Sequence, residues 1–452
     1  MNALKNENIF KLFVRLTIPS FAIVLVSGSY SIIDGIFLGQ SLGTVGNATN
    51  SYIFIIYAMI NAISCLVAQG TSSLISLKMG AGENKRVEKL WGTSIWLTIV
   101  VSIITSLIFM FSLEVFFCIM NIDSKYHSYI YDYYNLFLLC TPIYFLGHTF
   151  LYCIRSEGLV SKVLKINILA FVVNLITGCV FIRFLNWGFV GSALSTILAN
   201  LSICIISFLH FRKTIFKIKL KNIRFEKKDS LNILSTGLSV FISRFCSVAL
   251  MVLYNYICLK CAGETGIASL SIATTIYRYV ITIIDALTTG VQPIIGYNYG
   301  AKQYDRVKKS LKYAIIVGTV FSVVIFAAVQ LFSVQIIQLF NSEDSQIWKF
   351  GSNAIRTVMT VVFLQGIVSM GTYYYQYIGE KKKSTILVII RQIILQVPLS
   401  IVLPIYFGID GLWTAFWISD LIIFVIIVVC LTKSILQINK EKKLVAKEVP
   451  ST

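Results

Sequence analysis

Charged residues are scarce in this chain of 452 amino acids. Asp, Glu, Lys and Arg together make up 13% of the sequence, whereas hydrophobic residues make up 57%. A soluble globular protein carries about 25% charged residues, so the composition excludes an ordinary soluble fold. Because the apolar excess needs lipid around it, the composition indicates a protein embedded in a membrane.

Histidine is also rare, and this weighs against an enzyme. The three histidines are His127, His148 and His210, and none belongs to an HExxH sequence or to an acyltransferase-like His/Asp pair. Cys258 and Cys261 have CxxC spacing but no further ligands close in the sequence. We therefore expect no catalytic residues, no metal site and no cofactor.

Long charge-poor stretches locate the membrane-spanning segments. About 20 apolar residues cross a bilayer as a helix, and lipid offers no other partners to the backbone. The sequence predicts helices at residues 16–38, 51–77, 91–113, 129–152, 163–184, 189–211, 235–259, 267–298, 311–333, 350–375, 384–407 and 411–432. The predicted fold class is an all-α polytopic membrane protein with twelve transmembrane helices.

Positive charge lies mostly on one side of these segments. If the N-terminus is cytoplasmic, the cytoplasmic segments hold 31 of the 39 Lys and Arg residues and the opposite segments hold four. This bias follows the positive-inside rule for an even number of helices. We expect a multi-pass protein of the cell (cytoplasmic) membrane with both termini in the cytoplasm.

The net charge of +19 could suggest a nucleic-acid partner, but its distribution does not. The longest basic run, at 212–230, has no folded module of its own. We interpret it as a cytoplasmic loop near anionic lipid headgroups, so membrane lipid is the expected partner and nucleic acid is not.

The chain repeats itself at a shift of 220 residues. Gly80-Ala81 recurs as Gly300-Ala301, and the Gly188–Gly191 turn recurs as Gly408–Gly411. Six helices bring each half back to the side where it began, so the two lobes are expected to share one orientation about a pseudo-two-fold along the membrane normal. Parallel repeats of this kind are typical of transporters. The predicted parts are an N-terminal lobe at 1–211, a basic linker at 212–230, a C-terminal lobe at 231–435 and a tail at 436–452.

Asp34 is the most informative residue, because it is a lone acid in the first apolar segment. A carboxylate in that position costs roughly 2.5–3.5 kcal/mol on insertion scales. An ionisable residue inside a membrane helix is a functional candidate by default. We therefore expect Asp34 to carry the mechanism, by taking up and releasing a coupling ion.

Other polar residues inside the spans can each be interpreted in two ways. Asn174 and Thr196, on the fifth and sixth helices, could assist Asp34 or could only join helices by hydrogen bonds. Arg356 and Arg391 are expected to extend toward headgroups at the cytoplasmic ends. Prolines inside spans allow bending during transport but are also common passive features. Candidates for substrate contact or gating are Gln69, Tyr254, Arg244, Arg278, Asp285, Gln292 and Pro293.

Three strings of residues resemble the multidrug and toxic compound extrusion (MATE) family. They are Ile33–Gly39 in the first helix, Met79–Gly82 in the first cytoplasmic loop and Gln292–Lys302 at the end of the eighth helix. The resemblance covers nearly the whole chain. It implies two six-helix lobes that export organic cations or other amphiphiles by H⁺ or Na⁺ antiport, by alternating access.

The resemblance also implies roles for individual residues. It makes Asp34 the coupling-ion acid and places Asn174 and Thr196 in the same first-lobe site. Relatives in one branch often have a second acid one turn after the asparagine, where this chain has Gly178. The second-lobe acid of another branch has no evident counterpart. With one carboxylate instead of two, H⁺ is favoured over Na⁺ as the coupling ion.

Two other functions fit the sequence less well. A flippase for a lipid-linked saccharide, from the same superfamily, would need a strongly basic cavity, to which Arg244, Arg278 and Arg356 could contribute. A channel does not explain the two-lobe repeat. We expect a monomer that acts on a small organic cation or amphiphile.

Overall fold

The computed structural model describes residues 2–212, 214, 222–338 and 345–448. Within these ranges every regular element is a helix. Residues 213 and 215–221, which form much of the predicted basic linker, lie outside the described residues. So do the last four residues of the predicted tail.

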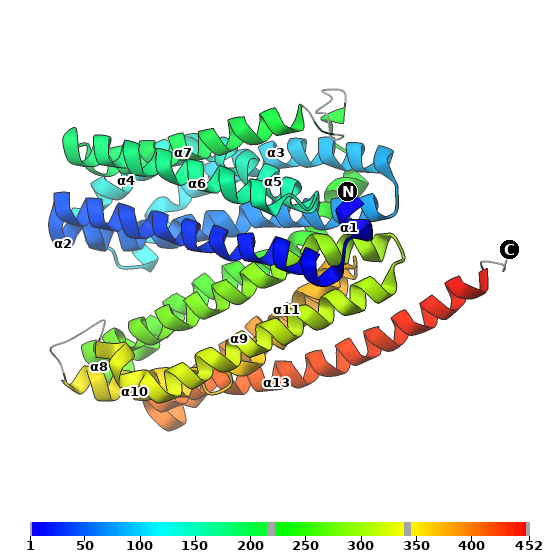
Figure 1. The fold of residues 1–452 in the computed structure, drawn as a ribbon. Coiled ribbons are helices and arrows are strands. Elements are labelled where there is room, and N and C mark those ends of the chain that lie inside the picture. The colour runs from blue at the N-terminus through cyan, green and yellow to red at the C-terminus, as the bar shows by residue number, and fades with distance from the viewer. Residues whose placement is uncertain (1, 213, 215–221, 339–344, 449–452) are drawn as a thin grey trace. The chain divides into compact units, whose positions relative to one another are not determined.

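The chain divides into two compact units, and residues 18–244 form the first. The helices α5, α6 and α7 lie side by side in it (Figure 1). The unit holds most of α2 (Ile9–Gly80), α3 (Asn84–Ile119), η1 (Ser124–Tyr126), α4 (His127–Leu139), α5 (Thr141–Ser156), α6 (Val160–Gly178), η2 (Cys179–Phe184), α7 (Gly188–Phe211) and the beginning of α8 (Lys227–Gly300).

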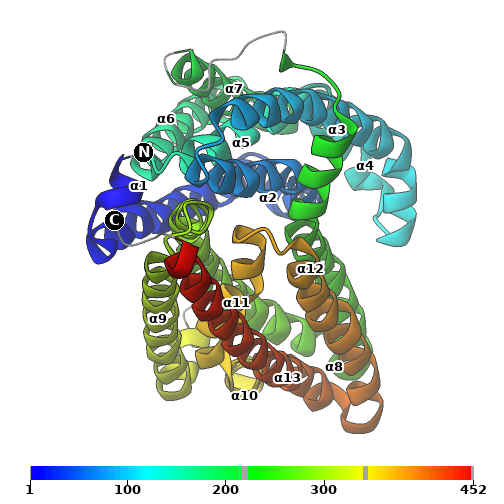
Figure 2. The same cartoon turned by 90° about the vertical axis from the view of Figure 1, so that its right-hand side faces the viewer.

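The second unit combines residues 2–17 with residues 245–452. Within it α11 lies between α9 and α13 and packs against both (Figure 2). The unit holds α1 (Asn2–Asn6), the rest of α8, α9 (Tyr304–Gln338), α10 (Ser345–Val358), η4 (Val362–Leu364), α11 (Gln365–Tyr377), α12 (Lys381–Ile389), η5 (Ile390–Gln396) and α13 (Val397–Glu448).

The number of membrane crossings follows from breaks inside the longest helices. In the described residues nine helices are long and apolar enough to cross a membrane, or ten when the bent pair α4 and α5 counts as one crossing. Two of these helical stretches are double crossings, broken at Gly43 (φ 62°) and Gly408 (φ 57°). Splitting them gives twelve, so the predicted all-α, twelve-helix class is confirmed.

The glycines at these breaks obey the 220-residue repeat. Gly43 corresponds to Gly263 (φ 59°), and Gly188 (φ 52°) corresponds to Gly408 (φ 57°). All four have positive φ, a conformation that costs little for glycine and is unfavourable for residues with a Cβ atom. The repeat seen in the sequence is therefore a repeat of backbone conformation as well.

The breaks of α2 and α8 lie away from the prolines inside these two helices. Pro19 and Pro293 lie inside α2 and α8, yet the non-helical residues of these helices are Gly43 and Gly263. The predicted helix at 129–152 is in fact two helices, α4 and α5, which meet at Cys140 with a bend of 59°. A proline close to a helix start is well tolerated, as at the beginning of α5.

Each unit has its own hydrophobic core. In the first unit the core gathers around Tyr134, Phe137 and Phe145, and in the second around Met359 and Trp413. Large apolar side chains also cover the outside of both units, and Phe111 on α3 is 79% exposed. Apolar surface of this extent is expected of helices that face lipid.

Candidate functional site

Asp34 lies in the first half of α2, within the first unit. Its carboxyl oxygen Oδ1 is buried and has no hydrogen-bond partner in the described part of the chain. Buried polar atoms in proteins are nearly always paired, so an unpaired carboxyl oxygen inside a membrane helix needs a functional reason. The position is therefore suited to a group that exchanges its partner.

Three tyrosines lie close enough to this carboxyl group to be affected by its charge. Tyr30 and Tyr57 belong to α2 and Tyr133 to α4, and the charge of Asp34 acts on all three hydroxyl groups. Tyr133 also shares a hydrogen bond with the side chain of Thr196. Asp34 and Thr196 thus both act on the hydroxyl group of Tyr133.

Asn174 lies on α6, which packs against the first half of α2. The ring of Tyr30 packs edge-on against Phe171 with centroids 5.5 Å apart, and a Cβ atom on Gly178 would lie 3.5 Å from Phe37. The first contact lies one helical turn before Asp34 and Asn174 in the sequence, and the second lies one turn after them. Asp34 and Asn174 therefore lie at the same height along the two helices. Asn174 is 1% exposed, and its Oδ1 atom is a second buried oxygen without a partner.

Ser195 completes this cluster, although nothing in the sequence pattern marks it as a site residue. Its hydroxyl accepts a hydrogen bond of 3.4 Å from Nδ2 of Asn174 and donates one of 2.9 Å to the carbonyl of Ser192. It would also lie 3.8 Å from a Cβ atom on Gly178. Its place directly before Thr196 on α7 was the only available signal. We call Asp34, Asn174, Ser195 and Thr196 the first-unit polar cluster.

The helix α6 changes its winding immediately beyond this cluster. Residues Cys179–Phe184 form η2, a π-helical segment. Such segments are rare and are frequent at functional sites, because the extra residue in the turn redirects the side chains that follow. The second unit has a corresponding π-helical segment, η5.

The second unit contains a different polar cluster, built around Asp420. Its Oδ1 atom accepts a hydrogen bond of 2.9 Å from Arg391, and its Oδ2 atom accepts one of 3.0 Å from Tyr277 and a further one from Gln365. Both carboxylate oxygens are therefore paired. The expectation that Arg391 extends to the headgroups is wrong, because its guanidinium is held by this buried carboxylate.

Tyr254, which corresponds to Asp34 at the 220-residue shift, is close to this second cluster. Its hydroxyl accepts a hydrogen bond of 2.7 Å from Nε2 of Gln396, whose Oε1 accepts one of 2.5 Å from Ser419. The equivalent position in the second unit is thus occupied by neutral, mutually paired groups.

The remaining candidates are spread over both units. Gln69 is buried and donates a hydrogen bond of 3.0 Å to the hydroxyl of Tyr152, and Arg244 acts electrostatically on the same hydroxyl. In the second unit Arg278 is exposed and donates to Thr275 over 3.4 Å. Asp285, Gln292 and Pro293 follow on the same helix, α8.

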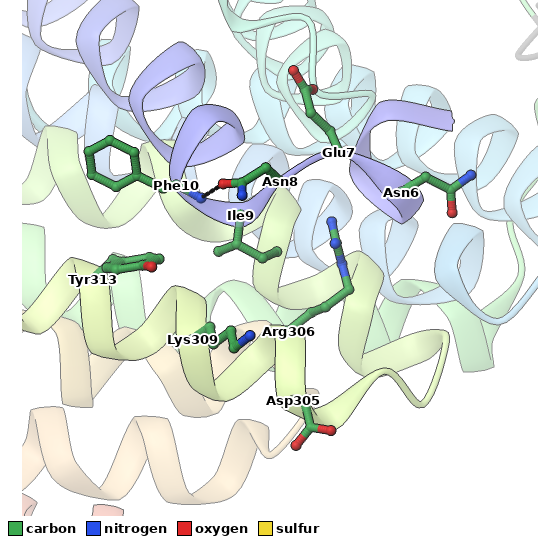
Figure 3. A pocket seen from close by; sticks show the side chains of 9 residues that line it. All are labelled: Asn6, Glu7, Asn8, Ile9, Phe10, Asp305, Arg306, Lys309 and Tyr313. Atoms are coloured by element: carbon green, nitrogen blue, oxygen red, sulfur yellow. Dashed lines mark hydrogen bonds between the residues drawn. The ribbon is translucent and has the colours of Figure 1, made fainter.

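A pocket of about 260 Å³ lies at the N-terminal segment of the second unit (Figure 3). Arg306 and Asn298 both donate to the carbonyl of Leu4, over 3.0 and 3.2 Å, and Arg306 also donates to Asn298 over 2.8 Å. Asn298, which belongs to the third string of the family resemblance, therefore fastens α1 to the end of α8. The pocket is lined by Asn6, Glu7, Asn8, Ile9, Phe10, Asp305, Arg306, Lys309 and Tyr313.

The two acids that line this pocket are already paired. Glu7 pairs with Arg15 over 2.8 Å, and Asp305 pairs with Lys308 and Lys442 over 3.3 and 2.7 Å. No unpaired buried charge is aimed at a ligand here among the described residues, so this pocket is not the candidate for transport.

Solved structures share this fold over nearly the whole chain. One, described as the outward-facing conformation of a multidrug resistance MATE family transporter of the MOP superfamily, is 24% identical with a TM-score of 0.89, covering 96% of this chain and 98% of that one. Another, of MATE in complex with MaL6, is 23% identical with a TM-score of 0.88, covering 97% and 99%.

Curated relatives are similar over the same extent. Multidrug export protein MepA of Staphylococcus haemolyticus is 24% identical over 415 residues, which cover 91% of this chain and 90% of the relative. MepA of Staphylococcus saprophyticus is 24% identical over 422 residues, covering 92% of each. The MatE family model matches residues 19–180 and 239–402, one segment in each half of the sequence. The chain therefore belongs to the MatE family and is a twelve-helix membrane transporter of two six-helix lobes, not an enzyme.

Proposed function

We propose that this protein exports amphiphilic small molecules, organic cations among them, in exchange for protons that bind Asp34. The observation that carries the proposal is the contrast between two buried acids. Asp34 has a buried oxygen without a partner, whereas both oxygens of Asp420 are paired. An acid that cycles between charged and neutral forms needs a free oxygen, and Asp420 has none to offer.

The first-unit polar cluster favours a proton over a metal cation. Na⁺ would need several oxygen ligands around it. The hydroxyls of Ser195 and Thr196 are already bonded to neighbouring groups, and Gly178 supplies no second carboxylate. A proton needs only the carboxyl group of Asp34. The unpaired Oδ1 of Asn174, at the same level, is an acceptor for the neutral acid.

Transport then follows from a shift between two states of the protein. If the protonated and the substrate-bound forms favour different states, protonation of Asp34 shifts the population toward release. Moving one charge across 100 mV is worth roughly 2.3 kcal/mol. Because each 1.4 kcal/mol is tenfold, one proton exchanged for an uncharged substrate supports about a fiftyfold substrate gradient at that potential. Exchange of one proton for a monovalent cation moves no net charge, so that exchange draws only on the pH difference.

We also propose the orientation and assembly of the chain. The charge bias supports a cytoplasmic location for both termini, and the construction of the first-unit polar cluster from one chain supports a monomer. In a cysteine-free background, a cysteine at position 85 should react with an impermeant reagent only after the cell is opened. A cysteine at position 125 should react from outside intact cells, and the reverse pattern would invert the topology.

The test of the coupling ion uses purified protein in lipid vesicles loaded with a fluorescent organic cation. Either a pH gradient or a Na⁺ gradient is imposed while the membrane potential is clamped. Transport should follow the pH gradient, stop with a protonophore and be indifferent to Na⁺. Na⁺-driven transport that persists without a pH gradient would show that a proton is not the coupling ion.

A further inference from the structure

The pocket at the N-terminal segment of the second unit has a surplus of positive charge. All of its lining residues belong to that unit. Its two acids are compensated by basic residues outside the lining: Glu7 pairs with Arg15, and Asp305 pairs with both Lys308 and Lys442. The two basic residues of the lining itself are therefore not needed to neutralise these acids.

Arg306 and Lys309 are these two basic residues. The hydrogen bonds of Arg306 go to neutral oxygens, the side-chain oxygen of Asn298 over 2.8 Å and the carbonyl of Leu4 over 3.0 Å. Lys309 is exposed, and neither residue forms an ion pair in the part of the chain that the structure describes. The two are three residues apart on α9, so their side chains leave neighbouring turns of one helix face. An anion in the pocket would thus meet two positive charges without displacing a carboxylate.

The same face of α9 changes from basic to aromatic to aliphatic along the helix. Tyr313, one turn further on, also lines the pocket and meets Phe10 edge-on, with ring centroids 5.7 Å apart. The two rings lie at one end of the pocket, and Arg306 lies toward the other (Figure 3). Ile316 and Val320 continue this face and are 45% and 58% exposed. Tyrosine is typical of the boundary between headgroups and hydrocarbon, and exposed aliphatic side chains beyond it face the acyl chains.

This order of groups matches the order of groups in a phospholipid. The phosphate, the glycerol backbone and the acyl chains follow one another as the basic, aromatic and aliphatic residues do. The pocket volume of about 260 Å³ is below the roughly 300–1,000 Å³ of pockets that enclose drug-sized ligands. It therefore suits a headgroup whose chains stay outside. A soluble phosphate compound would use the two basic residues but would gain nothing from the exposed aliphatic ones.

We propose that this pocket binds the headgroup of an anionic phospholipid, with Lys309 and Arg306 at its phosphate and the acyl chains along Tyr313, Ile316 and Val320. Basic pockets at the cytoplasmic ends of membrane helices are suited to such headgroups, because the cytoplasmic leaflet carries the anionic lipids. The inference rests on the proposed cytoplasmic location of the N-terminus. It concerns neither the coupling ion nor the transported molecule.

The experiment titrates the purified full-length protein, freed of lipid in a neutral detergent, with dioleoyl phosphatidylglycerol or dioleoyl phosphatidylcholine. The second lipid has the same chains and no net charge, and native mass spectrometry reports the fraction of protein with one lipid bound. The wild type should prefer phosphatidylglycerol about tenfold or more, as expected for two basic residues at an anionic headgroup. In Lys309→Gln this preference should fall about fivefold, the effect of one basic residue, while phosphatidylcholine binding stays unchanged. Lys309→Arg should keep the preference.

Lys312→Gln is the matched control. It removes the same charge from an exposed lysine of α9 that does not line the pocket, so it should leave the preference unchanged. Equal losses in Lys312→Gln and Lys309→Gln would overturn the proposal, because they would indicate diffuse attraction between the helix end and anionic lipid. A wild-type protein that binds the two lipids equally would also overturn it. Because Lys309 is exposed, Lys309→Gln should keep the wild-type melting temperature in detergent, which separates a lost preference from unfolding.

A soluble phosphate compound is the alternative source of the anion, and a second arm tests it. Glycerol 3-phosphate, which carries the phosphate and the glycerol without chains, is added during the phosphatidylglycerol titration. Lipid binding that persists in a large excess of glycerol 3-phosphate supports the lipid site, whereas displacement at concentrations comparable to the lipid would overturn it. Because no ion gradient is used and Asp34 belongs to the first unit, Asp34→Asn should keep the lipid preference. Failure of the export proposal would therefore be seen separately.

Discussion

Arg391 and Asp420 form a buried ion pair in the second unit, with Nη2 of the arginine 2.9 Å from Oδ1 of the aspartate. The arginine comes from η5 and the aspartate from α13. Gln365 accepts from the same Nη2 over 3.0 Å and also donates to Asp420, so the pair belongs to a closed network. The guanidinium of Arg391 is thus a permanent counterion for Asp420, and it belongs to the protein itself.

Removing one partner of this pair should destabilise the protein strongly. Asp420→Asn or Arg391→Gln leaves a buried charge without its counterion, at a cost of about 3–5 kcal/mol. The double variant Arg391→Met with Asp420→Leu should be more stable than either single variant, because no charge remains to be compensated. Thermal unfolding of the purified proteins checks this order, and a double variant less stable than both singles would contradict it.

The same pair should be dispensable for ion coupling. At a temperature where Asp420→Asn is folded, its transport should still follow an imposed pH gradient, since Asp34 is intact. A folded Asp420→Asn protein that binds substrate but no longer responds to pH would show that the second unit takes part in coupling.

Asp34→Asn should abolish active export while the protein still folds. The amide has nearly the size of the carboxyl group but cannot titrate, so it cannot exchange a proton during the cycle. Substrate binding should be retained, which a dye-binding measurement on the purified variant checks. Wild-type pumping by Asp34→Asn under the same pH gradient would exclude Asp34 as the coupling group.

A second acid at position 178 should make the transporter sensitive to Na⁺. A Cβ atom on Gly178 would meet only ordinary contacts, 3.5 Å from Phe37 and 3.8 Å from Ser195, so a side chain can be started there. Gly178→Asp would give the first-unit polar cluster two carboxylates, and transport should become stimulated by Na⁺. Gly178→Asn, which adds similar bulk without charge, is the control and should stay indifferent to Na⁺.

Close packing of α2 against α8 should make Gly237 intolerant of any side chain. A Cβ atom there would lie 1.8 Å from the carbonyl oxygen of Leu66, a backbone atom that cannot move aside easily. Gly237→Ala should therefore destabilise by about 1–3 kcal/mol or more, as overpacking does. Gly28→Ala is the control, because nothing lies within 4 Å of its added atom. Alanine favours a helix by about 1 kcal/mol over glycine, so this control should not lower the melting temperature.

Most of the fold could be predicted because a lipid bilayer allows the backbone few structures. Apolar length and charge placement locate a helix in a bilayer, and the repeat at 220 residues located the turn at Gly188 and its partner at Gly408. The bend at Cys140 was not predicted, although Pro142 lies two residues further on, because a proline inside a membrane helix does not by itself show that the helix is broken. The sequence pattern separates two membrane spans here but does not show how they are connected. It therefore did not predict that α2 continues as a helix on both sides of Gly43.

The site was only partly predictable. Asp34 stands out as a lone acid, and Asn174 and Thr196 were chosen as polar residues in apolar helices; the structure sets both near Asp34, although their roles remain proposals. Ser195 was missed because serine is common in membrane helices. The pairing of Arg391 with Asp420 was missed because 29 residues separate them, and nothing local indicates that their helices meet.

The two π-helical segments explain why a repeat of the backbone is not a repeat of side-chain roles. Glycine positions agree at a shift of 220 residues, but η2 begins at Cys179 and η5 at Ile390, a shift of 211. Because the two π-helical segments begin at different places in the repeat, residues between the two starting positions point in different directions around the helix axis in the two halves. At the shift of 220, Asn174 corresponds to Ile394, yet the residue that reaches Tyr254 is Gln396. A residue removed from η5 would turn everything after it by about 100°, so the later residues of the second unit would lose their present contacts.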